Sequence, residues 1–369
     1  MYYKNFHGKQ ISKLGLGCMR FPLVQGSERE IDRPRAEKLL DTAIANGVNY
    51  FDTAFIYQDQ DSERFLGEAL SRYPRESYFL TTKYYEGVGL TIEEMFEKQL
   101  QNCRTEYFDF YLLHSVNRSH MPGLMKEENY KFLLRQKEAG RIRNIGFSSH
   151  AAPDELERFL DWHDSFDMAM IQLNYLDWTL LHAQRQYEIL TERGLPVWVM
   201  EPLKGGRLAS LNREAEDILR AAAPERSIAS WSFRFLQGLE NVQTILSGMT
   251  SETIMQDNFS TFAREDRLSA AEQDALRHAR EVFLKDMGVP CSACRYCCKT
   301  CPAGLDIPLL IRGYNEMRIS GEEWRLPELK QTKGPENCLH CGICTKHCPQ
   351  EIKIPDVMRA LEALRQKKH

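Results

Sequence analysis

From about residue 14 to residue 250, short apolar runs alternate with amphipathic stretches in a regular rhythm. Apolar runs of this length indicate buried strands, and stretches with apolar residues every three or four positions indicate helices. The stretch 34–47 opens with proline and ends in Asn-Gly, as helices often do, and a second helical stretch covers 62–73. The predicted strands are 14–19, 49–54, 78–83, 108–114, 142–148, 168–174, 197–201 and 242–248.

Eight strands, each followed by a helix, over roughly 250 residues predict an α/β fold of the (β/α)8 TIM-barrel type. The alternative is a doubly wound open sheet. No G-x-G-x-x-G turn follows the first strand, although that turn is typical of open sheets that bind dinucleotides. The number of strands therefore favours the barrel. Residues 269–287 form an amphipathic pattern that predicts a final helix closing the barrel region.

The tail of the chain carries the same cysteine pattern twice. Each copy reads C-x2-C-x2-C-x3-C-P, first over 291–302 and again over 338–349. This spacing matches the bacterial iron–sulfur run, in which three cysteines bind one [4Fe–4S] cluster and the fourth binds the other cluster. It predicts two clusters, the first on Cys291, Cys294, Cys297 and Cys348, and the second on Cys338, Cys341, Cys344 and Cys301. Cys298 falls outside the pattern and is interpreted as an incidental thiol.

Zinc is the alternative metal, because pairs of C-x2-C also form tetrahedral zinc sites. The third cysteine and the Cys-Pro ending of each copy favour iron and sulfur. Helical patterns follow the two copies at 308–320 and 355–368, and a polar linker covers 321–337. The tail thus resembles a dicluster ferredoxin domain of the mainly helical type. We predict two domains, a barrel over 1–287 and a small iron–sulfur domain over 288–369.

Composition argues against several classes of protein. Lys and Arg total 48 against 52 acidic residues, and no basic stripe invites nucleic acid or an anionic membrane. No apolar run is long enough to span a bilayer, and the N-terminus lacks an apolar signal core. Nine of the eleven cysteines lie between Cys291 and Cys348, which favours metal binding over disulfides. We expect a cytoplasmic protein.

Polar side chains end three consecutive predicted strands. Asp52, Lys83 and His114 lie at or near the ends of the second, third and fourth strands, and Tyr57 lies in the loop after the second. In barrels of this type the reacting groups come from the C-terminal ends of strands. Taken singly, each residue also has a structural explanation, such as a helix cap or a packed ring. Four such groups on neighbouring strands predict a catalytic site.

With these residues in place, the first 285 or so residues resemble the aldo-keto reductase family. The matching motifs include 15-GLGCMR-20, 47-GVNYFDTAFIY-57, 141-RIRNIGFSS-149 and 247-SGM-249. The resemblance implies that hydride from a nicotinamide cofactor reduces the carbonyl of a small-molecule substrate. The loop 116–129, after the fourth strand, is predicted to line the substrate mouth.

The resemblance places the family's catalytic tetrad on the same four residues, Asp52, Tyr57, Lys83 and His114. Tyr57 would protonate the forming alkoxide. Lys83 would favour the phenolate and draw the pKa of Tyr57 downward, while Asp52 would keep Lys83 charged and oriented. His114 would hydrogen-bond the substrate oxygen and position it.

The resemblance also implies a set of cofactor-binding residues. They are Gly17, Cys18, Met19, Ser148, Ser149, Gln172, Met200, Pro202, Leu203, Gly205, Gly206, Ser247, Gly248, Glu252 and Asn258. The resemblance assigns the nicotinamide carboxamide to Ser148, Ser149 and Gln172, the pyrophosphate to the loop 202–206, and the adenine side to Glu252 and Asn258. Ser149 stands where the family usually has Asn, and Met200 stands where an aromatic ring normally stacks on the nicotinamide. Uncharged Ser247 and Thr253 stand where the family grips the 2′-phosphate of NADP. NADP or NAD is therefore the expected cofactor.

The two halves of the chain carry electrons differently, because nicotinamides transfer hydride and [4Fe–4S] clusters transfer single electrons. In one interpretation the barrel reduces a carbonyl or related unsaturated compound with NAD(P)H, and the tail is a structural or docking module. In another, the clusters deliver single electrons to a substrate in the barrel while Tyr57 still supplies a proton, and a redox partner protein is an expected partner. In a third, the chain is an electron-transfer or redox-sensing module that binds nicotinamide without turnover. We predict an oxidoreductase, with electron transfer through the tail as an additional hypothesis.

Overall fold

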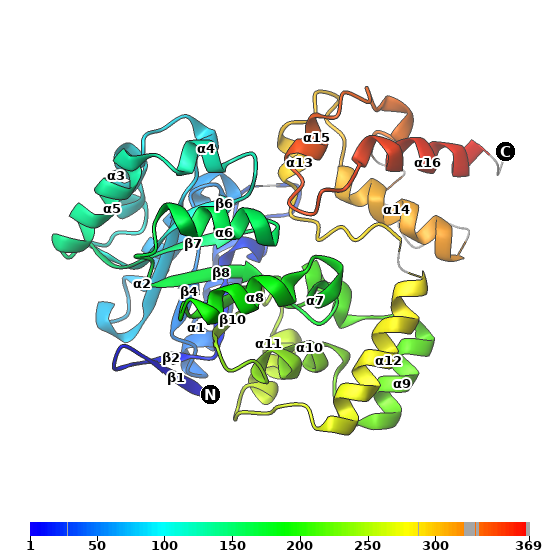
Figure 1. The fold of residues 1–369 in the computed structure, drawn as a ribbon, viewed down its shortest axis with the longest axis horizontal. Coiled ribbons are helices and arrows are strands. Elements are labelled where there is room, and N and C mark those ends of the chain that lie inside the picture. The colour runs from blue at the N-terminus through cyan, green and yellow to red at the C-terminus, as the bar shows by residue number, and fades with distance from the viewer. Residues whose placement is uncertain (28, 287, 321–328, 330–331, 367–369) are drawn as a thin grey trace. The chain divides into compact units, whose positions relative to one another are not determined.

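The computed structural model describes residues 1–27, 29–286, 288–320, 329 and 332–366 (Figure 1). Eight parallel strands close into a barrel in the order β10-β3-β4-β5-β6-β7-β8-β9. All eight predicted strands are present, which confirms the (β/α)8 architecture. Their bounds are β3 Leu14–Gly17, β4 Tyr50–Asp52, β5 Phe79–Tyr84, β6 Phe108–Val116, β7 Ile142–Ser149, β8 Met168–Gln172, β9 Val197–Met200 and β10 Val242–Ser247.

Helices connect successive strands of the barrel, and local sequence signals explain where they start. The Asp32 carboxylate accepts a hydrogen bond from the Arg35 backbone N–H at the start of α1, and Thr91 and Glu94 form a capping box at the start of α3. The helices are α1 Arg33–Ala45, α2 Asp61–Leu70, α3 Ile92–Asn102, α4 Met121–Leu124, α5 Glu127–Glu138, α6 Pro153–Trp162, α7 Asp177–Leu180, α8 Ala183–Glu192, α10 Ile228–Gln237 and α11 Glu252–Thr261. None of the helices in the described ranges has the length and apolar character that crossing a membrane requires.

An antiparallel hairpin precedes the barrel, and the sequence analysis did not predict it. Its strands are β1 (Tyr3–Phe6) and β2 (Lys9–Ser12). The ring of Phe6 packs against those of Phe110 and Trp198, with centroids 5.6 and 5.2 Å apart. The hairpin thus contributes to the apolar core inside the barrel at the N-terminal ends of the strands. The C-terminal ends, where barrels of this type do chemistry, are at the opposite end.

By its internal contacts the chain divides into two compact units. One comprises Met1–Pro202 and Ser230–Leu268, and the other comprises Leu203–Ala229 and Ser269–His369. In the second unit, α9 (Arg213–Ala222) packs against α12 (Ala270–Asp286), as Figure 1 shows. Helix α12 corresponds to the predicted closing helix over 269–287, whose last residue lies outside the described residues. The domain boundary between residues 287 and 288 stays a prediction, because contacts define units whereas independent folding defines domains.

The tail repeats a pattern of cysteine motif, short helix and longer helix. The short helices are α13 (Tyr296–Lys299) and α15 (Ile343–Lys346). The longer helices, α14 (Ile307–Ser320) and α16 (Ile354–Gln366), confirm the predicted helical stretches, except that positions 367–368 of the second stretch lie outside the described residues. The predicted linker over 321–337 lies largely outside the described residues, and its end forms the single turn η7 (Pro335–Asn337).

The backbone repeats this pattern residue by residue. Three pairs of equivalent positions are left-handed in both copies, with φ of 55° and 49° for Ala293 and His340, 65° and 75° for Arg295 and Gly342, and 64° and 51° for Gly304 and Glu351. Four of these six residues are not glycine, so the two motif loops are strained. Strain of this kind persists only where the surroundings enforce it.

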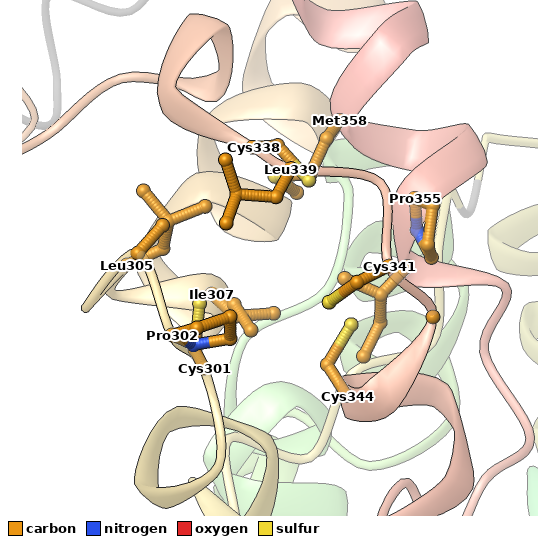
Figure 2. Close-up of a pocket in the computed structure, with 13 residues that line it drawn as sticks. Cys301, Pro302, Leu305, Ile307, Cys338, Leu339, Cys341, Cys344, Pro355 and Met358 are labelled. Carbon is orange, nitrogen blue, oxygen red and sulfur yellow. The ribbon is translucent and has the colours of Figure 1, made fainter.

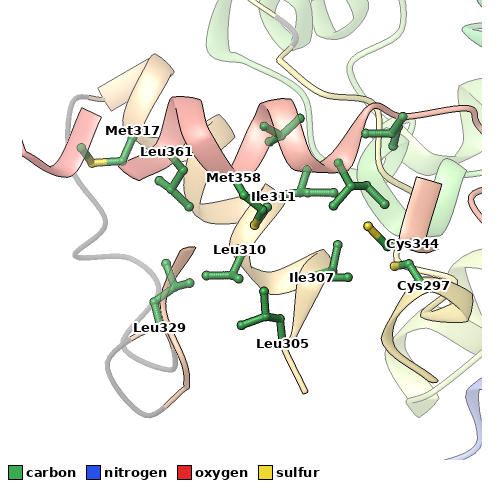
Figure 3. Packing of buried hydrophobic residues seen from close by; sticks show 13 residues of the cluster. Cys297, Leu305, Ile307, Leu310, Ile311, Met317, Leu329, Cys344, Met358 and Leu361 are labelled. Atoms are coloured by element: carbon green, nitrogen blue, oxygen red, sulfur yellow. The ribbon is translucent and has the colours of Figure 1, made fainter. Parts of the chain in front are cut away.

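A small apolar core joins the two halves of the tail. Figure 3 shows side chains of α14, among them Leu310 and Ile311, close to those of α16, among them Met358 and Leu361. Cys297 and Cys344 are buried at one end of this cluster. A core of this size stabilises a domain weakly, so cross-links or metal sites are usually needed as well.

Candidate active site

A buried ion pair joins the ends of β4 and β5. Lys83 Nζ donates hydrogen bonds to Asp52 Oδ1 at 2.7 Å and to the Thr53 carbonyl oxygen at 2.6 Å. Both charged side chains are almost fully buried. Burial raises the pKa of Asp52 above its ordinary value, although the Lys83 ammonium opposes that shift. Because a buried charge is costly to leave without its partner, Asp52 fixes the position of the ammonium.

The tyrosine and the histidine of the predicted tetrad lie beside this pair. Lys83 Nζ is 5.2 Å from the centroid of the Tyr57 ring, and the rings of Tyr57 and His114 meet edge to face with centroids 6.1 Å apart. Burial and, secondarily, the Lys83 charge lower the pKa of His114 well below its usual value, so its imidazole is neutral at pH 7. Within the described part of the chain, His114 Nδ1 has no hydrogen-bond partner. The structure therefore brings the four residues together, and their catalytic roles stay predictions.

The backbone is strained directly after Tyr57. Gln58, Asp59 and Gln60 have φ of 45°, 50° and 73°, left-handed values that residues other than glycine rarely adopt. Gln58 is held by its Nε2, which donates to the Met19 carbonyl oxygen at 2.6 Å. Such strain concentrates at functional sites, where the surrounding contacts hold it in place. The turn thus ties the segment that carries Tyr57 to the end of β3.

Residues predicted to hold the nicotinamide lie at the C-terminal ends of the strands. Gly17 ends β3, and Cys18 and Met19 follow in η1 (Cys18–Arg20), while Ser148 and Ser149 end β7, Gln172 ends β8 and Met200 ends β9. Ser148 Oγ accepts a hydrogen bond from the Ser115 backbone N–H at 2.9 Å. Gln172 Nε2 donates to Asp177 Oδ2 at 2.8 Å, and Gln172 Oε1 lies 3.1 Å from His150 Nδ1. These contacts fix the polar groups at the strand ends.

Two cations lie against the residues predicted to bind the adenosine half of the cofactor. Those residues are at the end of β10 and in α11, namely Ser247, Gly248, Glu252 and Asn258, the last of which donates to Ser247 Oγ at 2.8 Å. Lys38 of α1 forms an ion pair with the Glu252 carboxylate. A Cβ added at Gly248 would meet Arg20 Cγ at 2.8 Å, so the Arg20 side chain lies directly over this glycine. No sequence pattern predicts a cation here, because Arg20 and Lys38 come from parts of the chain distant from residues 247–258.

The loop 202–206, predicted to bind the cofactor pyrophosphate, follows β9. Its residues Leu203, Gly205 and Gly206 belong to the second compact unit. Gly205 and Gly206 have φ of 66° and 95°, a conformation that strains any other residue. Consecutive left-handed glycines leave backbone N–H groups uncovered by side chains, which suits an anion such as a phosphate.

Two cavities in the tail are each lined by four cysteines. One is lined by Cys291, Cys294, Cys297 and Cys348, and the other by Cys301, Cys338, Cys341 and Cys344. Figure 2 shows the second cavity, with the sulfur atoms of Cys341 and Cys344 turned toward it. The fourth cysteine of each motif therefore lies with the first three of the other motif. The two groups are the same two ligand sets that the spacing predicts.

The donor chemistry of both cavities fits an iron–sulfur cluster. Each offers four thiols among apolar walls, and Ile354 contributes to both. The Ala293 backbone N–H donates to Cys291 Sγ at 3.3 Å, a type of bond that tunes the potential of such clusters. Among the described residues, no three His, Cys, Asp or Glu side chains converge as the ligands of a single metal ion do. In a cubic cluster each thiolate binds a different iron, so the four sulfurs surround a space instead of meeting at one atom.

Comparison with known proteins matches two parts of the chain to two families of sequence. The sequence profile of the aldo/keto reductase family matches residues 13–281, and that of a 4Fe-4S dicluster domain matches residues 290–352. The chain belongs to the aldo/keto reductase family. Its C-terminal part is a 4Fe-4S dicluster domain.

Individual relatives are distant and match different shares of the chain. The uncharacterized oxidoreductase YqkF of Bacillus subtilis is 26% identical over 309 residues, which are 74% of this chain and 95% of the relative. Probable aldo-keto reductase 1 of Glycine max is 27% identical over 210 residues, which are 54% of this chain and 58% of the relative. The structure of aldo-keto reductase AKR11C1 from Bacillus halodurans superposes with a TM-score of 0.61 at 22% identity, over 76% of this chain and 96% of that one. At that identity the likeness shows the fold.

In this aldo/keto reductase, further polar rings surround His114 that the sequence analysis did not single out. The Tyr85 ring centroid lies 5.6 Å from that of His114 and 5.1 Å from that of His120. Tyr85 Oη and His120 Nε2 are 3.4 Å apart, and His120 Nδ1 lies 3.0 Å from the Ser115 carbonyl oxygen. His120 falls in the loop predicted to line the substrate mouth, which was the one sequence signal for it. Tyr85 and His120 are thus placed to shape the space in front of His114.

The neutral state of His114 predicts how stability changes with pH. An unfolded histidine titrates near 6.5, whereas the folded His114 has a much lower pKa, so below pH 6.5 the unfolded state binds the extra proton. We expect the free energy of unfolding of the wild type to fall relative to that of His114→Asn as the pH falls from 7.5 to 5.5. Below pH 6.5 the slope of this difference should be up to about 1.4 kcal/mol per pH unit. Anaerobic thermal melts of both proteins at several pH values measure this difference. A constant difference across the range would contradict it.

Proposed function

We propose that the barrel reduces the carbonyl group of a small molecule, or a related unsaturated group, with hydride from a nicotinamide cofactor. One observation supports this most directly: the buried Lys83 is bonded to Asp52 and lies 5.2 Å from the ring of Tyr57. A phenol has a pKa near 10, which makes it a poor acid at neutral pH. A neighbouring ammonium favours the phenolate and so makes proton donation easier. This arrangement supports Tyr57 as the proton donor.

The four residues would divide the work as follows. The bound nicotinamide supplies hydride to the carbonyl carbon. Tyr57 donates its hydroxyl proton to the carbonyl oxygen as negative charge develops there, and Lys83 stabilises the phenolate that remains. Asp52 keeps the ammonium charged and in place. The neutral imidazole of His114 donates a hydrogen bond from its ring N–H to the carbonyl oxygen and orients the substrate.

For the cofactor, we assign the nicotinamide carboxamide to Ser148, Ser149 and Gln172 and the pyrophosphate to the loop 202–206. The strand-end hydroxyls and carboxamide are hydrogen-bonding groups held in place by neighbours, and the loop presents left-handed glycines. These features support a nicotinamide dinucleotide as the ligand. Met200 at the end of β9 offers an apolar thioether surface in place of a stacking ring.

Between the two dinucleotides we propose a preference for NADPH, with Arg20 as the group that contacts the 2′-phosphate. Arg20 lies over Gly248, in the part of the site assigned to the adenosine, and an arginine pairs well with phosphate. Arg20→Ala should raise the Kd for NADPH about tenfold or more, because a hydrogen bond to a charged group contributes about 1.5–3 kcal/mol. The Kd for NADH should change less than about twofold. Fluorescence titration measures both constants, and equal losses for the two dinucleotides would exclude this role.

For the tail, we propose two [4Fe–4S] clusters bound by the two sets of cysteines that line the cavities. Such clusters exchange single electrons, so a second candidate function is electron exchange with a redox partner protein. The observation that favours it is the solvent exposure of Cys341, one of the four cysteines of its cavity. A cluster bound there would lie near the protein surface, where a partner can approach it.

A single set of anaerobic measurements tests these proposals together. NADPH or NADH is mixed with the purified protein and a panel of aldehydes and ketones, and the nicotinamide absorbance and the visible cluster absorbance are followed. Consumption of nicotinamide that depends on a carbonyl supports the reductase. Bleaching of the visible absorbance on addition of nicotinamide alone joins the tail to the barrel chemistry. Binding of nicotinamide without turnover across the panel would favour a redox-sensing module instead.

A further inference from the structure

The glycine loop and the first cysteine motif are in direct contact within the second compact unit. A Cβ added at Gly205 would lie 2.1 Å from the backbone oxygen of Ser292 and 2.7 Å from its carbonyl carbon. Ser292 stands between Cys291 and Cys294, is 2% exposed, and lines the cavity formed by the first set of cysteines. Residue 205 is therefore glycine for two reasons, its positive φ and the absence of space. The backbone of the first motif rests on the backbone of the loop.

Both partners of this contact are anchored on the side away from it. Asn315 Nδ2 donates to the Val289 carbonyl oxygen at 2.8 Å, and Val289 N–H donates to Asn315 Oδ1 at 2.6 Å. This pair of hydrogen bonds holds the segment that leads into the first motif. On the loop side, the Arg207 guanidinium lies 5.7 Å from the ring centroid of Phe283 in α12. Because each segment is held on its far side, we expect a displacement of one segment to displace the other.

Among the described residues, no glycine approaches the backbone of the equivalent position in the second motif in this way. Leu339 is the counterpart of Ser292 in the repeat, and it is 66% exposed, although it too lines its cavity. The two copies have left-handed residues at three matching positions. Burial of Ser292 is therefore not a requirement of the cysteine motif. It is a property of the first copy, created by its packing against Gly205.

We propose that Ser292 is a positioning residue that links the first cysteine motif to the loop 202–206. A cluster in the first cavity and a dinucleotide whose pyrophosphate is bound by the loop then each strengthen binding of the other. The inference rests on the proposed role of this loop in cofactor binding. Four thiolate bonds would hold the strained motif in one conformation, because ligation of a metal group is coupled to local folding. A motif so held keeps Ser292 against Gly205 and the loop in its binding shape. By linkage, a ligand that orders the loop stabilises the motif by the same factor.

Two glycine substitutions in the same loop separate this contact from general strain. Gly205→Ala forces a methyl group against Ser292, whereas Gly206→Ala meets no atom within 4 Å, although both positions have positive φ. Iron release to a chelator is measured anaerobically for each variant. We expect Gly205→Ala to release about half of its iron at least fivefold faster than the wild type, and Gly206→Ala to release iron at the wild-type rate. Equal rates for the two variants would overturn the proposal.

The reciprocal effect is measured without altering the loop. Saturating NADPH should slow the release of half of the iron from the wild type about fivefold. It should slow iron release to the same extent in Cys341→Ser, which keeps only the first set of cysteines intact. No protection is expected in Cys294→Ser, which keeps only the second set. Protection in Cys294→Ser alone would assign the linkage to the wrong cavity and refute the proposal. If the wild type binds no nicotinamide, the proposed function fails, and the comparison of the two glycine variants still decides whether the contact supports the motif.

Discussion

Replacing Tyr57 with phenylalanine should lower kcat for carbonyl reduction about a thousandfold, because the only proposed proton donor is removed. That loss corresponds to about 4 kcal/mol of transition-state stabilisation. The substitution keeps the ring, its edge-to-face contact with His114 and its position near the Lys83 ammonium. KM and the Kd for the nicotinamide should change little, since the hydroxyl acts on the reacting oxygen. Steady-state kinetics with a carbonyl identified in the panel and a nicotinamide titration measure both quantities.

Tyr84→Phe is the matched control for this experiment. Tyr84 is next to Lys83 in β5, and its hydroxyl donates to the Leu90 carbonyl oxygen at 3.3 Å. Removal of that hydroxyl deletes one hydrogen bond outside the tetrad, so kcat should stay within about twofold of the wild type. If Tyr57→Phe reduces carbonyls as fast as Tyr84→Phe, the proton comes from another group, and the assignment of Tyr57 is wrong.

Replacing Cys297 with serine should remove one of the two clusters and loosen the tail. The iron content should fall from about eight to about four atoms per chain, because a [4Fe–4S] cluster needs its four thiolates. Cys297 is also buried in the apolar core that joins α14 to α16, so loss of the cluster should expose that core. Iron analysis and visible absorbance measure the loss of the cluster. Limited proteolysis, followed at residues 288 onward, measures the exposure of the core.

The neighbouring Cys298 provides the control, because it lines neither of the two cavities. Cys298→Ser should keep about eight iron atoms and wild-type resistance to protease. Equal iron loss in the two variants would show that the ligand sets are wrong. A colourless protein that contains zinc and no iron would support the tetrahedral zinc alternative instead.

Much of this fold follows from local patterns in the chain. The eight apolar runs predict the eight barrel strands because a strand buried on both faces must be continuously apolar, whatever it packs against. The tetrad could be predicted for a related reason. Asp52, Lys83 and His114 are polar residues at the ends of apolar runs, and a parallel barrel places the ends of neighbouring strands together.

Other features of the site arise from contacts between distant segments, and no local pattern predicts them. Lys38 reaches Glu252, and Arg20 reaches Gly248, across more than two hundred residues of sequence. Tyr85 and His120 are in contact because they follow the C-terminal ends of β5 and β6, which are neighbouring strands of the barrel. The N-terminal hairpin β1–β2 was missed because its strands are short and lack a clear alternation of polar and apolar residues.

The sequence by itself determined the barrel, the residues that end its strands and the two cysteine sets, since periodicity and spacing act over a few residues at a time. Only the tertiary structure decided that Ser292 packs on Gly205 whereas its counterpart Leu339 is exposed to water. The two motifs have the same cysteine spacing and left-handed residues at three matching positions, so neither the spacing nor these positions distinguish them. The difference in burial arises from close packing: because Gly205 has no Cβ, the backbone of Ser292 can approach it, and this contact buries Ser292.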